Sequence, residues 1–320
     1  GRTRGTSRYV SVRPVKEPVD SMDDSVTYVL DKLEWMRARK IWPSGQRYLW
    51  TDAFGVVLLV SLYEKLDDVS YLDQAVWLVS EVDRVLGRER GIRIGEAPDR
   101  DGQYFHYLAM WLYALAVLGR YLPKYRQQGI ALARQIHGPF LIPGRGVIWK
   151  MQEDLSGPYP DTGFGALDAF DGYVSYRMLD EETLANEITD MRDLIEIQNP
   201  DLYISQDLGL GMMLWLCHFF PDEHWATIQR RRCLEMLDRM WRREGYFSRE
   251  PYLPHTRFAF TNYGVSIGLQ AVAEMPSRVR QLNEYFETYR CGDEYDDAAI
   301  THVMACSSRF PGRLLCERVI

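Results

Sequence analysis

The sequence predicts an all-α fold, a closed (α/α)6 toroid built from six helical hairpins. Twelve helical segments of two kinds alternate along its 320 residues. One kind is apolar almost all round, whereas the other has apolar residues at i, i+3, i+4 and i+7 and charges on the opposite face. A helix that is apolar on every side has to be buried on every side, so six such helices should line a ring inside six amphipathic ones. An open helical solenoid is the alternative, but it would not need inner helices that are buried all round.

The inner helices are expected where the chain is apolar all round, at 50–66, 102–119, 164–179, 207–220, 260–274 and 296–309. The outer helices are expected where the pattern is amphipathic, at 23–39, 70–87, 123–137, 181–197, 222–243 and 276–290. Together these helices form a single domain over 23–320. The chain begins with a basic, polar stretch, so we expect 1–22 to be an N-terminal arm of poor order.

Short β-like stretches join outer helices to the inner helices that follow them, and they are expected at 91–97, 146–152, 201–207 and 245–252. Because the helices alternate in direction, all these connections lie on one rim of the toroid. The connections on the opposite rim are short. A scaffold with its longer loops on one side usually carries its binding site there, so we expect the site at the rim where the inner helices begin.

Composition limits the possible partners. The chain is 46% hydrophobic and 26% charged, with a formal net charge of −7. Binding to a phosphate backbone needs a basic face, so nucleic acid is not an expected partner. No apolar run approaches the roughly 18 residues that a membrane span needs. We therefore expect a small-molecule substrate and no membrane span, and the oligomeric state stays open.

Cysteine usage and the motif search indicate an intracellular protein without a cofactor. The five cysteines are scattered and form no CxxC pair, which predicts neither a disulfide framework nor a structural zinc site. A reducing compartment, the cytoplasm, is the expected location. The chain also has no HxH or HExxH metal motif, no phosphate-binding P-loop and no dinucleotide-binding turn. We expect no metal and no cofactor.

Two aspartates are unusual because they lie inside an apolar helix. Asp168 and Asp171 are three residues apart, which places both carboxylates on one face of the 164–179 helix. Buried carboxylates have either cationic partners or shifted pKa values. Arg93, Arg100 and Lys150 are candidate partners, and with them the pair would be structural rather than catalytic.

Polar and aromatic residues gather in the first two turns of the inner helices and in the adjoining loops. As catalytic candidates we single out Asp168, His106, Tyr104, Arg93 and Lys150. As substrate-binding candidates we single out Trp50, Phe54, Trp111, Trp149, Phe170, Asp171, Gln206, Met212, Asn262, Tyr263 and His302. For each histidine the alternative is a hydrogen-bonded wall residue, and for each aromatic residue or methionine it is plain core.

Several segments resemble a family of α/α-toroid proteins related to six-hairpin glycosidases and terpenoid cyclases. They are RGIRIGE (90–96), DRDGQYFHYL (99–108), VIWKMQEDLS (147–156), LDAFDGYVSY (167–176), RFAFTNYGVSIGLQAV (257–272) and DDAAITHVMACSSRFPG (296–312), and they span about two thirds of the chain. The resemblance implies the toroid fold and leaves the chemistry open. One departure is that Gly165-Ala166-Leu167-Asp168 stands where the family has Gly-Gln-His-Asp, which implies a more apolar basin here.

Three functions are compatible with these residues, and we favour a cofactor-independent cyclase or pericyclase. A concerted closure of the Diels–Alder type on a terpenoid-like natural product needs a snug apolar cavity that folds the substrate. It also needs one or two donors to polarise a carbonyl, which Arg93, His106, Lys150, Tyr104 or Tyr263 could supply. The DDxxD and DxDD motifs of ionising terpenoid cyclases are missing.

The alternative is a carbohydrate-active enzyme, either a glycoside hydrolase or a sugar epimerase. A hydrolase needs two carboxyl groups about 5–9.5 Å apart. Asp168, Asp171, Glu96 and Asp207 are the candidates, and Trp50, Trp149, Tyr104 and Tyr263 could stack on sugar rings. A third possibility is a toroid that binds a ligand or protein without catalysis, for which no separate interaction motif exists.

Overall fold

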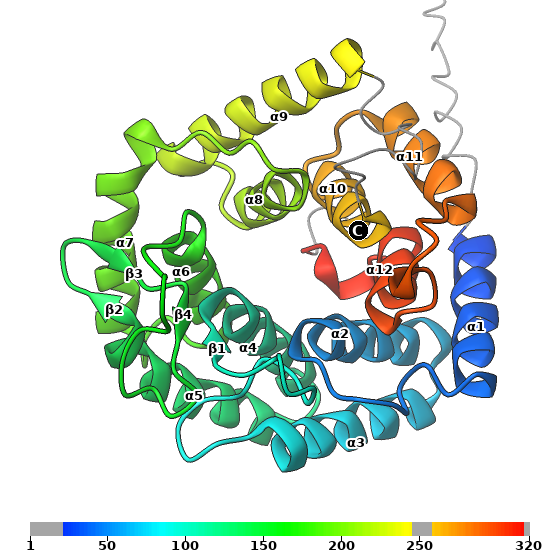
Figure 1. Ribbon diagram of the computed structural model, residues 1–320, viewed down its shortest axis with the longest axis horizontal. Helices are drawn as coiled ribbons and strands as arrows, with labels where there is room; N and C mark the ends of the chain where they lie inside the picture. Colours follow the sequence, from blue (N-terminus) through cyan, green and yellow to red (C-terminus); the bar gives the residue numbers. More distant parts are fainter. Residues whose placement is uncertain (1–21, 245–257, 317–320) are drawn as a thin grey trace, which may run out of the picture.

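The computed structural model describes residues 22–244 and 258–316, and over these ranges it confirms the predicted toroid (Figure 1). The inner ring consists of α2 (Leu49–Leu66), α4 (Phe105–Gly119), α6 (Asp168–Leu179), α8 (Asp207–Phe219), α10 (Ala259–Ala271) and α12 (Ala299–Arg309). The outer ring consists of α1 (Met22–Ala38), α3 (Val69–Leu86), α5 (Pro123–Phe140), α7 (Ala185–Gln198), α9 (His224–Glu244) and α11 (Pro276–Thr288). The predicted N-terminal arm lies outside the described residues except for Met22, and the β-like stretch expected at 245–252 lies outside them entirely.

The two kinds of helix differ in burial as their sequences require. In α4 every residue from Leu108 to Gly119 is buried. In α3 the buried residues form a single stripe, Leu72, Ala75, Leu78, Val79, Val82 and Leu86, which is the spacing of one helix face. Each inner helix packs against the next, and α12 packs against α2, so the ring closes. None of the helices in the described ranges is long and apolar enough to cross a membrane.

The far rim of the toroid is closed by the segment that follows α12. This segment contains a short 3-10 turn, η4 (Gly312–Leu314), that lies beneath the ends of the inner helices. Trp215 near the end of α8 donates its indole N–H to the Leu314 carbonyl (2.6 Å), and Tyr113 of α4 donates its hydroxyl to the Arg313 carbonyl. The Arg313 amide donates to the Ser61 hydroxyl of α2 (2.9 Å). A ligand can therefore approach the centre from the opposite rim, where the inner helices begin.

That open rim carries the β-structure. β1 (Gln103–Tyr104) pairs antiparallel with β4 (Lys150–Met151), and β2 (Leu141–Ile142) pairs with β3 (Gly146–Val147). Single bridges join Tyr48 to Gly95 and Ile148 to Phe164. The predicted β-like stretch at 146–152 thus contains two strands, and the one at 91–97 contains isolated bridges.

The prediction of a β-like stretch at 201–207 is wrong. The chain forms a 3-10 turn there, η1 (Asn199–Asp201), followed by irregular backbone. The reason is that α9 takes the carbonyl groups that a strand partner would use. Arg232 donates to the Asn199 and Leu202 carbonyls (2.9 and 3.0 Å), and Gln229 donates to the Asn199 side chain (2.8 Å).

Three inner helices begin later than expected because their approach segments have other partners. Residues 103–104 pair as β1 before α4 begins at Phe105. Before α6, the Gly165 amide donates to the Val147 carbonyl (2.9 Å), so that helix starts at Asp168 rather than 164. A 3-10 turn, η3 (Glu294–Asp296), precedes α12, which starts at Ala299.

Helices α8 and α10 approach so closely that only glycine fits between them. A Cβ added at Gly268 would lie 2.1 Å from the Gly211 carbonyl oxygen.

We therefore expect Gly268→Ala to lower the free energy of unfolding by about 1–3 kcal/mol, the usual cost of overpacking a core. Gly138→Ala is the control, because its Cβ meets nothing within 4 Å on helix α5, and we expect unchanged or higher stability, by up to about 1 kcal/mol. Urea unfolding monitored by circular dichroism measures both, and equal effects of the two substitutions would contradict this packing.

Candidate functional site

A histidine and a buried aspartate meet at the start of two neighbouring inner helices. His106 stands in the first turn of α4 and Asp171 in the first turn of α6, and His106 Nδ1 lies 2.6 Å from an Asp171 carboxylate oxygen. The carboxylate accepts, so Nδ1 carries the proton and Nε2 is left with a free lone pair. The His106 side chain is 24% exposed and that of Asp171 is 4% exposed. The imidazole is therefore the member of the pair that reaches solvent.

Asp168 completes a cluster of three titratable groups. It is the first residue of α6 and is 5% exposed, and its Oδ2 has no hydrogen-bond partner within the described chain. Burial, together with the nearby Asp171 carboxylate, raises the pKa of Asp168 to about 8. Gly165 leaves the room for this carboxyl group, because a Cβ there would lie 2.2 Å from Oδ2. At neutral pH Asp168 therefore carries a proton.

The shifts of the other two groups follow from the same arrangement. Burial raises the pKa of Asp171, and the charge and hydrogen bond of His106 oppose that effect. Burial also disfavours a charged imidazole, but the Asp171 carboxylate and its hydrogen bond outweigh it and raise the pKa of His106. These three groups share protons closely enough that their titrations belong to the cluster as a whole.

The prediction that cationic side chains pair with the two aspartates is wrong, because Arg93, Arg100 and Lys150 have other partners. Arg93 Nε contacts Glu153 (3.0 Å), and its other nitrogens donate to loop carbonyls, including that of Ala97 (3.1 Å). Arg100 donates to the Tyr48 hydroxyl (3.2 Å), and Lys150 Nζ lies over the Tyr159 ring (3.7 Å). Each of these cations contacts groups of the rim segments around it. The residue that contacts Asp171 is instead His106.

Aromatic rings lead outward from His106 along the rim. Trp50 lies beside the imidazole, with 4.7 Å between the ring centroids, and Tyr107 lies 5.3 Å from Trp50. Tyr104 follows at 4.9 Å from Tyr107, and Trp149 at 5.9 Å from Tyr104. We call these five rings, from His106 to Trp149, the aromatic path. Tyr107 was not among the residues predicted from the sequence, although the helix expected at 102–119 would have placed it on the same face as Tyr104, three residues earlier.

The centre beneath His106 is nearly filled. A narrow cavity of about 10 Å3, room for roughly one water, lies between α4, α6 and α8. It is lined by His106, Ala109, Met110, Tyr113, Asp171, Val174, Ser175, Met212, Trp215 and Leu216. Pockets that enclose drug-sized ligands measure about 300–1,000 Å3. The cavity is therefore too small to enclose a ligand of that size.

The remaining substrate-binding candidates fall into three groups. Phe54, Trp111 and Phe170 are fully buried and belong to the core, as is Trp50 except for its contact with His106. Tyr263 and His302 line a different small pocket among α10, α11 and α12, where His302 Nε2 donates to the Asp296 carbonyl (2.8 Å). Asn262 is buried and donates to the Phe258 carbonyl (3.0 Å), whereas Gln206 is exposed. The structure brings together His106, Asp168, Asp171, Trp50, Tyr104, Trp149 and Met212.

The other two carboxylates considered for sugar chemistry have structural partners. Glu96 accepts from the Arg47 amide (2.9 Å) in a rim loop. Asp207 accepts from the Leu208 amide (2.7 Å) and from the Thr261 hydroxyl (2.9 Å), which ties α8 to α10. Neither contacts the His106 cluster in any described interaction.

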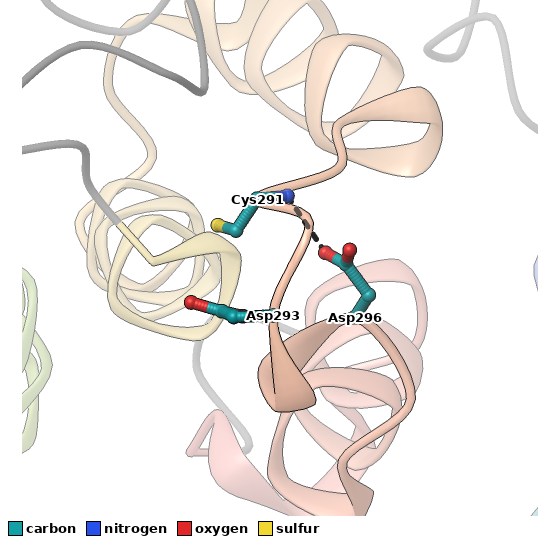
Figure 2. A group of neighbouring side chains, drawn as sticks. All are labelled: Cys291, Asp293 and Asp296. Atoms are coloured by element: carbon teal, nitrogen blue, oxygen red, sulfur yellow. Dashed lines mark hydrogen bonds between the residues drawn. The ribbon is translucent and has the colours of Figure 1, made fainter.

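A second group of potential ligand atoms lies before α12, where Cys291, Asp293 and Asp296 offer one atom each within 4.8 Å of one another (Figure 2). The Asp296 carboxylate accepts from the backbone N–H groups of Cys291 (2.7 Å) and Gly292 (2.8 Å). Asp293 accepts from the Tyr295 amide (2.9 Å). These bonds shape the loop that leads into α12, and they account for both aspartates.

The chain matches no protein-family model, and no curated protein matches its sequence. Its fold does match solved structures. Cellobiose 2-epimerase from Bacillus thermoamylovorans superposes with a TM-score of 0.63 at 11% identity, over 91% of this chain and 100% of that chain. D-mannose isomerase gives 0.64 at 10% identity, over 93% and 100%. A family 76 α-mannanase from Bacteroides thetaiotaomicron gives 0.59 at 11% identity, over 91% and 96%.

The fold is that of the six-hairpin, glycosidase-like α/α toroids. This confirms the resemblance drawn from the sequence at the level of architecture. At identities of 10–11% the likeness extends to the fold and no further.

The hydrogen bond between His106 and Asp171 can be tested by titration. With Asp171→Asn the attraction of the carboxylate is lost while burial remains, so we expect the pKa of His106 to fall from above to below its usual value of about 6.5. Imidazole resonances followed by NMR against pH measure this change. His302 lies in the other pocket, and its titration should be the same in both proteins. A His106 pKa that does not change would contradict the contact.

Proposed function

We propose that this toroid is a sugar isomerase, a carbohydrate-active enzyme that moves a proton between neighbouring carbons of an open-chain sugar. One observation carries the proposal: in the cluster of three titratable groups, the imidazole of His106 is 24% exposed whereas the carboxyl groups of Asp168 and Asp171 are 5% and 4% exposed. The group that can touch a substrate is thus a nitrogen base, which suits removal of a proton from carbon. A cluster of titratable groups with shifted pKa values, one of them open to solvent, favours catalysis over passive binding.

The structural neighbours support the sugar class of substrate. They include cellobiose 2-epimerases, a D-mannose isomerase and family 76 mannanases. The aromatic path supports it as well, because flat apolar rings are suited to the apolar faces of pyranoses.

The proposed reaction needs no redox cofactor. His106 Nε2 takes the proton from C2 of an open-chain aldose, the C2–H electron pair forms the C1–C2 double bond, and the carbonyl oxygen O1 accepts a proton from a water molecule at the mouth, which the buried Asp168 protonates in turn. The imidazolium returns its proton to C1, O2–H gives its proton back to Asp168 through the same water, and the product is the ketose. Asp171 is a positioning residue, because it holds the Nδ1 proton and stabilises the imidazolium. A single exposed base serves C1 and C2 from one side, which favours isomerisation over epimerisation.

Glycoside hydrolysis is the second candidate, because Asp168 has the raised pKa of a general acid. It would also need an ionised carboxylate that reaches the substrate, and Asp171 is buried and bonded to His106. The cyclase hypothesis has less support. A terpenoid-like chain would have to fold inside an apolar cavity, and the cavity beside His106 measures about 10 Å3.

The proposal is tested with reducing sugars. We expect the wild-type protein to convert D-mannose, D-glucose or cellobiose to the corresponding ketose, detected by NMR. His106→Gln removes the base and should lower kcat by about 10²–10⁴-fold, the range for loss of a general base. His302→Gln is the matched control, since His302 stands one turn into its inner helix but in the other pocket, and it should keep its activity. Equal activity of His106→Gln and the wild type would overturn the assignment.

The pH profile tests the role of Asp168. Activity needs neutral His106, so kcat/KM should rise with pH through the raised pKa of that residue, above about 6.5. It also needs protonated Asp168, so kcat/KM should fall as pH passes about 8. Asp168→Asn cannot ionise, and it should be slower but lose the alkaline limb. An alkaline limb that persists in Asp168→Asn would show that Asp168 is not the proton donor.

A further inference from the structure

The backbone of Trp149 is hydrogen-bonded on both sides at the open rim, while the residue is 37% exposed. Its amide donates to the Gly163 carbonyl (3.1 Å), and its carbonyl accepts from the Phe105 amide (3.2 Å). Phe105 begins α4 and directly precedes His106. The backbone of Trp149 is therefore tied to the helix that carries the proposed base. The indole has only two side-chain torsions to restrict, so it loses little conformational entropy when it binds a ligand.

The aromatic path runs without a break from His106 to Trp149, and its accessibility changes along the way. Trp50 at the inner end is almost fully buried, Tyr107 and Tyr104 are half-buried, and Trp149 at the outer end is exposed. A sugar ring does not fit in the cavity of about 10 Å3 beneath His106. The reacting residue therefore lies at the mouth, beside His106, and the next covalently linked sugar extends outward over the path.

Open space lies beside Trp149 on the neighbouring strand. Ile148 bridges Phe164, so the next pair in this antiparallel register is Trp149 and Gly163, with both side-chain positions on the opposite face from Ile148. Gly163 has no side chain, and a Cβ added there meets nothing within 4 Å. The cross-strand position that would normally cover the indole is therefore empty.

We propose that Trp149 is a second sugar subsite, on which a pyranose ring linked to the reacting open-chain residue stacks in the space beside Gly163. This inference rests on the proposed function, and it names the substrate class as reducing disaccharides or longer oligosaccharides. The apolar face of the second ring covers the indole while its hydroxyl groups stay in water. The reducing-end residue lies at His106, where the open-chain aldehyde is needed.

The test is calorimetric titration with cellobiose and D-glucose as probes, alongside the conversion of each sugar by the same proteins. The wild type should bind cellobiose at least about tenfold more tightly than D-glucose, a ratio that corresponds to roughly 1.4 kcal/mol. Trp149→Ala should remove that difference by weakening the binding of cellobiose. Gly163→Val should do the same with the indole intact, because the valine fills the space beside it.

Two matched controls separate the subsite from general damage to the protein. Trp77→Ala removes another exposed indole, on outer helix α3, and Gly157→Val fills another position where a Cβ meets nothing within 4 Å. Both should keep the preference for cellobiose. The inference is overturned while the proposed function stands if D-glucose conversion depends on His106 but Trp149→Ala and Gly163→Val keep the preference. If neither sugar binds or reacts, the proposed function fails and the subsite fails with it.

Discussion

An inner helix of this toroid is buried around its whole circumference, and this constraint decides where its charged groups can stand. A carboxylate in the middle of such a helix would lose its hydration without compensation. In the first turn it meets the positive end of the helix dipole and the polar loops of the open rim. Asp168 and Asp171 occupy the first turn of α6, and His106 occupies the first turn of α4. The fold thus brings these three titratable groups together at one mouth.

The same constraint determines the protonation of the cluster. Ionising two buried carboxyl groups three residues apart has a high free-energy cost, because their negative charges repel each other. Within the described structure, the imidazole of His106 is the only group beside them that can carry a positive charge. The hydrogen bond from His106 stabilises the negative charge of Asp171, and Asp168 keeps its proton. One base open to solvent, one neutral acid and one buried positioning carboxylate form the proton-transfer site of the isomerase that we propose. The closed floor at η4 and the filled centre place that chemistry at the rim.

The sequence was sufficient to predict the toroid and its open rim, because burial on all sides and burial on one side leave different patterns in each helix. It could not tell which way a given residue of an inner helix faces. Such a helix is apolar all round, so its pattern does not distinguish the centre from the outer wall, and Tyr263 and His302 were expected at the mouth although they face a separate pocket. Which side chain contacts Asp171 depends on how α4 is positioned along α6, and the pattern within each helix does not determine that. For this reason Arg93, Arg100 and Lys150 were expected as partners of the aspartates, and His106 was not. The choice of a cyclase over sugar chemistry rested on an apolar basin and on missing ionisation motifs, and neither of these determines the size of the cavity.

The central claim is that an imidazole at the mouth exchanges a proton with a sugar carbon. The most direct measurement is to incubate the protein with D-mannose, D-glucose and cellobiose in D2O and to follow the carbon-bound hydrogens by NMR and mass spectrometry. His106 is open to solvent, so the proton that it removes exchanges with D2O, and deuterium should appear at C1 of the ketose and at C2 of the recovered aldose. Glycosidic cleavage of cellobiose with no deuterium on any carbon would contradict the account.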